Sequence, residues 1–331
     1  MRAVVTFLAI VGCVKASFNA DVFDVEWNNF KVDYEKTYQD ISEHLHRKQI
    51  FKHNKEIIDR HNKRYAAGEE TFEMGINQFT DLLSHEFEAF ILGGLNATVD
   101  ETEIDLIYSP TGNIEIPSSV DWRQEGAVTR VKDQGRCGSC WAFAAVGTLE
   151  GQHYLKTGEL VELSEKNLLD CTSGKPYYNH GCNGGRATSA LLYVKRNHGI
   201  DTASWYPYKA KQGHCRFDGS HIGATVSRIV RIKRNSESAL AAAVAKKGPI
   251  AVSIEATHLH HYRGGVLRKS CHKRSNHAVV VVGYGHDTNG GDYWLVKNSW
   301  GSLYGENGYV RMARNENNMC FIASNAVYPL V

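Results

Sequence analysis

The 331-residue sequence lacks any hydrophobic segment long enough to cross a lipid bilayer. Its most apolar stretch covers residues 3–14, which is shorter than the roughly 20 residues that a spanning helix needs. This stretch follows a short basic start and precedes a Lys-Ala-Ser sequence at residues 15–17, an order typical of a secretory signal peptide. We therefore expect a signal peptide over residues 1–17 and a soluble mature protein, without a membrane span, that passes through the secretory pathway.

The sequence also lacks tandem repeats and low-complexity tracts, and its formal net charge is only +2. This small total hides an asymmetry. Residues 1–115 contain 11 Lys and Arg against 20 Asp and Glu, a net charge of −9, whereas residues 116–331 contain 27 against 16, a net charge of +11. Because opposite charges attract, the pattern fits a removable acidic segment that masks a basic domain. Two halves that are merely solvated would show the same totals.

No second cysteine pair at zinc-binding spacing follows Cys137-x-x-Cys140, which argues against a zinc site. A redox-active pair remains as one possible role of these two cysteines, and a catalytic thiol is the other. Of the eight cysteines, Cys13 lies in the expected signal peptide. An odd number of remaining cysteines in a secreted chain indicates one free thiol, while the other six can pair in many ways. The seven are Cys137, Cys140, Cys171, Cys182, Cys215, Cys271 and Cys320.

One of these cysteines lies at the start of an apolar, alanine-rich segment. Residues 134–143 read Gln-Gly-Arg-Cys-Gly-Ser-Cys-Trp-Ala-Phe, and we expect a helix over about 139–156 that ends at Gly158. A helix N-terminus lowers the pKa of a thiol and so favours the nucleophilic thiolate. Gln134 can donate a side-chain N–H to an oxyanion that forms beside the sulfur. Cys140 is therefore the candidate nucleophile.

The same segment matches the Cys-Gly-Ser/Ala-Cys-Trp/Tyr signature, and the chain resembles papain-family cysteine proteases of the cathepsin L type. Two propeptide motifs strengthen the resemblance. Residues 75–81 complete the Gly-x-Asn-x-Phe-x-Asp motif. An aromatic stripe at Trp27, Phe30, Tyr34 and Tyr38 precedes a second helix that carries the complete Glu-Arg-Phe-Asn-Ile-Asn motif on one face. Its members are Glu43, Arg47, Phe51, Asn54, Ile58 and Asn62.

The resemblance implies an α+β, papain-like fold of two lobes, one mainly helical and one β-barrel-like, with the cleft between them. A mainly helical inhibitory propeptide would cover residues 18–115 and the peptidase domain residues 116–331. Within the propeptide we expect a short strand over 71–76 and a short helix over 81–92. The composition of residues 93–115 indicates a flexible linker open to proteolysis. Further strands are expected over 250–254, 278–284, 293–297 and 309–313.

The resemblance also implies a cysteine endopeptidase, made as an inactive precursor, that works through a thioester acyl-enzyme. His277 would be the base, since a thiolate beside an imidazolium is a stable ion pair. Asn298 would accept the imidazole N–H, and Trp300 would cover that hydrogen bond. A turn amide and a core aromatic are the alternative interpretations of these two residues. Gln134 and the Cys140 backbone N–H would form the oxyanion hole.

Substrate-binding residues and disulfides follow from the resemblance as well. Gly184 and Gly185 would form the wall along which a substrate backbone pairs, unless they are a plain loop. Tyr304 stands where many relatives have tryptophan, which would change the primed side. The disulfides would be Cys137–Cys182, Cys171–Cys215 and Cys271–Cys320, with Cys140 free. The pocket for the second residue before the cut, expected to take Leu or Phe, would be lined by Arg186, Ala187, Ser253, Ser275, Ala278 and Asn325.

The implied partners are protein and peptide substrates, the propeptide itself and cystatin-type inhibitors. We expect a monomer that needs no cofactor, metal or nucleic acid. Asn96 carries the one N-glycosylation sequon found. His258, His260 and His261 offer a metal-binding cluster, but such a loop is more often solvated. Basic runs at 231–234 and 268–274 are more often exposed surface than sites for glycosaminoglycan or nucleic acid.

An inactive homologue that keeps the fold and serves as a binding or inhibitory protein is the alternative function. The intact set of Gln134, Cys140, His277 and Asn298 favours the enzyme.

Overall fold

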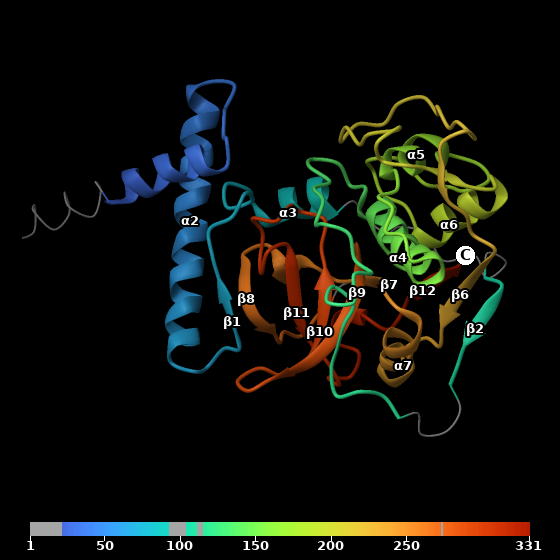
Figure 1. The fold of residues 1–331 in the computed structure, drawn as a ribbon. Helices are drawn as coiled ribbons and strands as arrows, with labels where there is room; N and C mark the ends of the chain where they lie inside the picture. The colour runs from blue at the N-terminus through green and yellow to red at the C-terminus, as the bar shows by residue number, and fades with distance from the viewer. Residues whose placement is uncertain (1–21, 93–103, 111–114, 273) are drawn as a thin grey trace, which may run out of the picture.

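The computed structural model describes residues 22–92, 104–110, 115–272 and 274–331. The predicted signal peptide and the Asn96 sequon lie outside these residues. None of the helices within these residues has the length and apolarity that crossing a membrane requires. Figure 1 shows an N-terminal helical unit beside a large sheet, with further helices on the far side of the sheet.

The N-terminal unit is built from a helix over residues 22–33 and the long helix α2 (Ile41–Ala66). Trp27, Phe30 and Phe51 are buried together, and Tyr34 and Tyr38 pack against them. The four aromatic residues of the stripe therefore form one cluster against α2, although the helix ends at residue 33 and Tyr34 and Tyr38 lie after it.

The motif face of α2 is turned toward the segment that follows it. Asn54 Nδ2 donates to the carbonyl oxygens of Thr80 and Leu82, at 2.8 and 2.9 Å. Asn62 exchanges two hydrogen bonds with the backbone of Met74. The polar members of the motif thus satisfy backbone groups of a loop that has few partners of its own, which explains why the motif contains asparagine.

That segment contains a short strand, an α-helical turn, α3 (Ser84–Phe87), and a π-helical turn, η1 (Glu88–Leu92). Residues 81–92 are thus only partly α-helical. Phe79, Phe87, Ile91 and Leu92 belong to the same buried cluster as the sheet. The predicted propeptide therefore shares a core with the predicted peptidase domain.

The described residues form one ten-stranded mixed sheet. Its strands are β1 (Phe72–Met74), β2 (Leu106–Tyr108), β3 (Val120–Asp121), β6 (Arg228–Ile232), β7 (Ile250–Ile254), β8 (Tyr262–Leu267), β9 (His277–Asp287), β10 (Gly291–Lys297), β11 (Tyr309–Ala313) and β12 (Ala326–Leu330). Their order is β1-β8-β11-β10-β9-β7-β12-β6-β2, and β3 pairs with β9. The four strands predicted after residue 226 are all present. Both ends of the sheet come from the predicted propeptide.

The remaining helices are α4 (Cys140–Thr157), α5 (Glu165–Cys171), α6 (Ala187–Arg196) and α7 (Glu237–Lys247). A separate two-stranded antiparallel sheet of β4 (Ile200–Asp201) and β5 (Ile222–Ala224) and two 3₁₀ turns, Thr257–Leu259 and Met319–Phe321, complete the described part of the fold. In Figure 1, α4, α5 and α6 gather on one side of the sheet. As predicted, α4 ends at Gly158, whose φ of 80° is the left-handed conformation that glycine adopts readily.

Three disulfides link Cys137–Cys182, Cys171–Cys215 and Cys271–Cys320, and Cys140 is free. These are the pairs that the resemblance implies. The first holds the segment before α4 to the loop that contains Gly184, because its two cysteines flank these elements.

Residues 104–110 correct the prediction of a flexible linker over 93–115. Leu106–Tyr108 form β2 on the edge of the sheet. The acidic composition suggested disorder, but Asp105 forms an ion pair with Lys195, and Tyr108 packs against the core. Residues 93–103 and 111–114 lie outside the described residues.

The histidine cluster corrects another prediction, since two of its members are not solvated. His260 and His261 are buried, while His258 is half-buried. The ring of Phe87 stacks on His260 at 4.5 Å between centroids, and His260 stacks on His261 at 4.0 Å. Of the basic run at 231–234, Arg231 is likewise buried rather than exposed.

Candidate active site

Cys140 is the first residue of α4 and is completely buried. The helix N-terminus places unpaired backbone N–H groups and partial positive charge beside the sulfur. Cys140 Sγ donates to the carbonyl oxygen of Leu92 at 3.5 Å. The helix packs against β9, the strand that begins with His277, so the predicted nucleophile and base come from two facing elements.

His277 and Asn298 are joined by a hydrogen bond of 2.8 Å between Nε2 and Oδ1. The sheet explains this proximity, because Asn298 directly follows β10 and the end of β10 pairs antiparallel with the start of β9. Asn298 Oδ1 also accepts the N–H of Ser299, which orients the oxygen as the acceptor and His277 Nε2–H as the donor. His277 Nδ1 is buried, and none of the described residues forms a hydrogen bond with it. This nitrogen is therefore available to take a proton.

Trp300 covers this pair as predicted. Its ring lies on the ring of His277 at 4.7 Å between centroids and 26° between planes. Trp300 is in turn covered by the edges of Phe79 and Phe87, each at 5.4 Å. Tyr304, the predicted departure on the primed side, is also buried here and donates to the carbonyl oxygen of Leu259.

Gln134 lies beside the same site and is buried. Its Oε1 accepts from Ser299 Oγ at 2.6 Å, which fixes the amide so that Nε2 points the other way. Nε2 donates to the carbonyl oxygens of Ile91 and Cys137, at 2.7 and 3.0 Å. Gln134 thus presents a side-chain donor to a peptide carbonyl, which is the role expected of an oxyanion-hole residue.

The last two residues of η1 therefore occupy the site. Carbonyl groups at a helix C-terminus have no partner within the helix. Here the carbonyl of Ile91 accepts from Gln134, and that of Leu92 accepts from Cys140. Because the two groups bond to different carbonyls, neither peptide bond is presented to the thiol and to the oxyanion donor together.

Burial disfavours charge on both catalytic candidates in this state. Burial raises the pKa of Cys140 to about 11, although backbone N–H groups of Ala278 and Trp141 lower it in part. Burial also lowers the pKa of His277 to about 4, against the hydrogen bond to Asn298. Both shifts favour the neutral form of the group and disfavour a thiolate–imidazolium pair.

The predicted substrate-binding residues fall on both sides of the site. Gly184 and Gly185 follow Asn183, which bridges to Gly138 two residues before Cys140. A Cβ on Gly185 would lie 2.6 Å from Asn179 Oδ1, so packing alone already requires glycine at this position. Arg186 is the buried N-cap of α6, and Ala187 is the first residue of that helix.

The other members of the predicted pocket lie at the sheet. Ser253 on β7 is opposite Ala278 on β9, and the Ser253 N–H donates to the carbonyl of Asn325 at 3.1 Å. The structure thus brings Ser253, Ala278 and Asn325 together. Ser275 is half-buried two residues before His277.

A buried charge network behind the site was not predicted. Lys132 Nζ contacts the carboxylates of Glu150 and Glu165 at 2.7 and 2.6 Å, and Lys297 Nζ donates to Thr129 Oγ1. Burial lowers the pKa of Lys297 to about 8, with the neighbouring charge of Glu150 raising it in part. Because Glu150 lies on α4 and Lys297 precedes Asn298, the network joins the two elements that carry the site.

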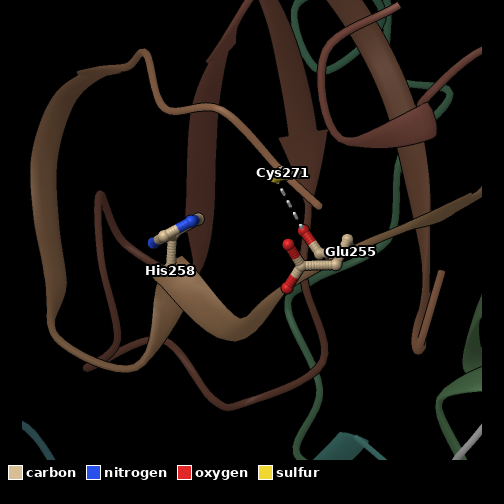
Figure 2. Close-up of side chains that lie close together, drawn as sticks. All are labelled: Glu255, His258 and Cys271. Carbon is tan, nitrogen blue, oxygen red and sulfur yellow. Dashed lines mark hydrogen bonds between the residues drawn. The ribbon is translucent and has the colours of Figure 1, made fainter. Parts of the chain in front are cut away.

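Glu255, His258 and Cys271 also lie close together (Figure 2), with one potential ligand atom of each within 4.8 Å of the others. Cys271, however, is bonded to Cys320. Metals bind the thiolate form of cysteine. This group therefore does not provide three metal ligands while the disulfide is intact.

Comparison with known proteins agrees with this geometry. Residues 116–330 match the family model for papain family cysteine proteases, and residues 27–87 match the cathepsin propeptide inhibitor domain. The chain is 45% identical over 335 residues to cathepsin L1 of Drosophila melanogaster, covering 98% of this chain and 90% of that protein. It is 44% identical to cathepsin L of Sarcophaga peregrina, with both chains covered completely.

Solved structures give the same result. Digestive procathepsin L 3 from the larval midgut of Tenebrio molitor superposes with a TM-score of 0.86 at 42% identity, covering 93% of this chain and 99% of that one. Digestive procathepsin L2 of the same source superposes with a TM-score of 0.87 at 37% identity, with 93% and 100% covered. The chain therefore belongs to the papain family of cysteine proteases, as a cathepsin L-like endopeptidase made as a proenzyme with its inhibitory propeptide bound.

Proposed function

We propose that Cys140 is the nucleophile of this protease and His277 its acid and base. In the active enzyme, Cys140 Sγ transfers its proton to His277 Nδ1, the nitrogen that has no other partner. The thiolate then attacks the substrate carbonyl carbon, and the imidazolium protonates the leaving amine. Water, deprotonated by His277, hydrolyses the thioester and restores the thiol. Asn298 keeps the imidazole in the required tautomer, and Trp300 excludes water from their hydrogen bond.

Gln134 Nε2 and the Cys140 backbone N–H form the oxyanion hole in this proposal. Donors held in place before the reaction stabilise the negative charge of the tetrahedral intermediate without reorganisation. The observation that carries the proposal is that Gln134 Nε2 and Cys140 Sγ each bond to a main-chain carbonyl of the propeptide. A substrate carbonyl would use the same donor once the propeptide has left.

Latency has two causes in this proposal. The propeptide covers the site sterically, and by burying Cys140 and His277 it keeps both groups neutral. Removal of residues 79–92 would expose the two groups to water and relieve the desolvation that opposes the ion pair. The pKa of Cys140 would then fall and that of His277 would rise.

Titration of the enzyme with a small thiol-alkylating reagent, added up to one equivalent, tests the proposal. We expect activity of the matured enzyme to fall in proportion to the reagent added. We expect Cys140 in the precursor to react about 100-fold more slowly at pH 6, because it is buried and protonated. Activity that survives complete alkylation would contradict the nucleophile, and equal rates in the two forms would contradict the account of latency.

The mature chain is expected to begin close to Ile116 or Pro117. The Pro117 carbonyl accepts from Tyr284 Oη at 3.0 Å, and β3 then pairs with β9, so a chain that starts here keeps its first anchor on the sheet. N-terminal sequencing or intact mass of the active form checks this. A start beyond Asp121 or before Gly93 would contradict it.

Asn325 is expected to influence which side chain is accepted two residues before the cut. It lies beside Ser253 and Ala278, and a polar lining accepts more than Leu or Phe. We expect Asn325→Ala to shift the preference toward larger apolar side chains several-fold, since burying a CH₂ is worth about 0.8 kcal/mol. The ratio of kcat/KM for matched Phe and Leu substrates measures the shift. An unchanged ratio would exclude Asn325 from the pocket.

The remaining assignments are proposals by family resemblance. We infer that the enzyme passes through the secretory pathway to the lysosome or the extracellular space, works as a monomer on protein and peptide substrates, and is inhibited by cystatin-type proteins.

A further inference from the structure

One end of the sheet is completed by a strand from outside the peptidase domain. In Figure 1, β2 runs beside β6 at the end of the sheet far from α2. The three residues of β2 pair in parallel with residues 230–232. Two bonds extend the pairing, since the Asp105 N–H donates to the Ile229 carbonyl at 3.0 Å and the Lys233 N–H donates to the Tyr108 carbonyl at 2.9 Å. The segment is therefore held mainly through its backbone.

A charge fixes the register of this segment. One carboxylate oxygen of Asp105 accepts the Ile229 N–H at 2.7 Å, and the other accepts from Lys195 Nζ on α6. Burial raises the pKa of Asp105, but the hydrogen bonds from Lys195 and Ile229 and the charges of Lys195 and Arg228 outweigh it and hold the pKa below its usual value. The site thus favours an ionised acid at this position.

Some side chains of the segment pack against the enzyme and others are exposed. Ile104 and Tyr108 pack against the two buried clusters of the molecule. Leu106 and Ile107 are 41% and 58% exposed. Recognition therefore rests on one acid, on apolar side chains at its flanks, and on the backbone between them.

Removal of the propeptide would leave β6 as the outer strand of the sheet, with β12 as its one partner among the described strands. An edge strand presents unpaired N–H and C=O groups, and extended peptides bind such edges by adding a strand. Lys195, Arg228 and Lys233 would surround this edge with positive charge. They discourage pairing with a second copy of the same basic edge and attract an acidic peptide.

We propose that the β6 edge, together with Lys195 and Arg228, is a second peptide-binding site of the matured protease, separate from Cys140. Its ligand is an extended segment of a protein substrate, with an acidic residue followed three positions later by an aromatic or bulky apolar residue, bound in parallel to β6. In the precursor, residues 104–108 fill this site as part of the same chain. The site gives protein substrates a contact that short peptide substrates do not make.

A peptide of residues 103–110 with a fluorescent label tests the site. It is titrated onto enzyme that has been matured from the full precursor and whose Cys140 carries a covalent peptidyl inhibitor, so that the catalytic cleft is filled. We expect saturable binding, because the β6 edge stays open. Absence of saturable binding under these conditions overturns the proposal, because the peptide would then bind only in the catalytic cleft or not at all.

A charge exchange identifies the edge. We expect Lys195→Glu to weaken binding of the peptide about tenfold or more, and an Asp105→Lys peptide to bind Lys195→Glu better than it binds the wild type. Lys209→Glu, at an exposed lysine of the peptidase domain, is the matched control and should leave affinity within about twofold. Equal affinity for wild type and Lys195→Glu, or equal loss in both charge variants, overturns the assignment.

Hydrogen exchange in the intact precursor provides an independent test. We expect hydrogen exchange at the Asp105 amide to be about tenfold faster in Lys195→Glu precursor than in wild type, whereas β1, at the opposite end of the sheet, keeps its protection. Hydrolysis of a short peptide by matured Lys195→Glu enzyme should be unchanged. Unchanged exchange at Asp105 would show that the charge does not hold the strand.

Discussion

A precursor in which Cys140 is replaced by serine is expected to fold, to form its three disulfides and to show no peptidase activity at any pH. Serine is nearly the same size as cysteine, and it can keep the bond to the Leu92 carbonyl that the thiol makes. Its hydroxyl, however, is not ionised by an imidazole as a thiol is. We expect kcat/KM to fall by about 10⁴-fold or more after the propeptide has been removed by an added protease. Residual activity close to that of the wild type would reject Cys140.

Two variants then separate the base from the residue that orients it. His277→Ala removes the proton acceptor and should abolish turnover to the same extent as Cys140→Ser. Asn298→Ala leaves the imidazole in place and removes the acceptor at 2.8 Å, so the ring can rotate. Misplacement of a catalytic group costs about 100-fold, and we expect an intermediate loss of this size. A larger loss in Asn298→Ala than in His277→Ala would reverse the assigned roles. Intact mass with and without reductant shows whether each variant keeps its disulfides.

Features with a local signal were predictable from the sequence. α4 was expected from its apolar, alanine-rich composition and from Gly158, and the structure gives nearly the same bounds. β7 and β11 begin and end at the predicted residues, since short apolar runs bounded by polar residues or glycine mark buried strands. Catalytic candidates were found because each stands in a specific motif.

Contacts between distant segments were not predictable in the same way. Composition predicts that residues 104–108 belong to a flexible linker, although Ile104, Leu106 and Tyr108 alternate with other residues as in a strand. The carboxylate of Asp105 is instead matched by Lys195, ninety residues later. Lys297 is a polar residue in the sequence, and nothing near it in the chain indicates that it is buried. In the fold it is buried close to the charge of Glu150, which lies on another element. A sequence pattern shows which residues need partners but not which partners they find.

The two buried histidines show the same limit, and they change the expected mechanism of acid activation. The opposite charges of the two halves predict a precursor that matures near pH 4–5 and stays latent at pH 7, because acid neutralises the carboxylates of the propeptide. Asp81, which closes the Gly-x-Asn-x-Phe-x-Asp motif, is the single carboxylate expected to contribute most. Asp81 is buried and binds Lys36 Nζ and Tyr38 Oη, at 2.8 and 3.0 Å. It therefore holds together the propeptide itself. His260 and His261, in contrast, lie in one of the contacts between propeptide and enzyme.

These histidines are enclosed by the propeptide. His260 stacks on Phe87, its Nε2 bonds to the Phe79 carbonyl at 2.9 Å, and its carbonyl accepts from Asn77. His261 accepts the Gly75 N–H with its carbonyl, while its Nδ1 is buried without a partner. The bond to the Phe79 carbonyl and the charge of Asp81 both raise the pKa of His260, but burial outweighs them. Burial lowers the pKa of His260 to about 4, and burial with the neighbouring His260 lowers that of His261 to about 2.

The sign of the effect follows from these shifts. A histidine whose pKa is lower in the complex than its free value of about 6.5 binds fewer protons there, so the complex is fully stable above pH 6.5 and weakens as pH falls toward the lowered pKa. Each pH unit within that window weakens the complex by up to about 1.4 kcal/mol for a histidine that the propeptide alone keeps neutral. Acidification from pH 6.5 to 4.5 should therefore loosen the propeptide.

We expect His261→Phe to lower the pH of half-maximal self-maturation by about one unit. Phenylalanine keeps the stacked ring, removes an unpartnered nitrogen and cannot be protonated. His53→Phe makes the same change at an exposed histidine of α2 and should leave this pH unaltered. Asp81→Asn should raise it, because Lys36 loses its counter-ion and the propeptide fold weakens at every pH. Precursor processing followed by gel and by peptide hydrolysis from pH 4 to 7 measures all three. If His261→Phe and His53→Phe match the wild type while Asp81→Asn alone shifts the profile, titration of the propeptide's own carboxylates, and not of the buried histidines, controls the release.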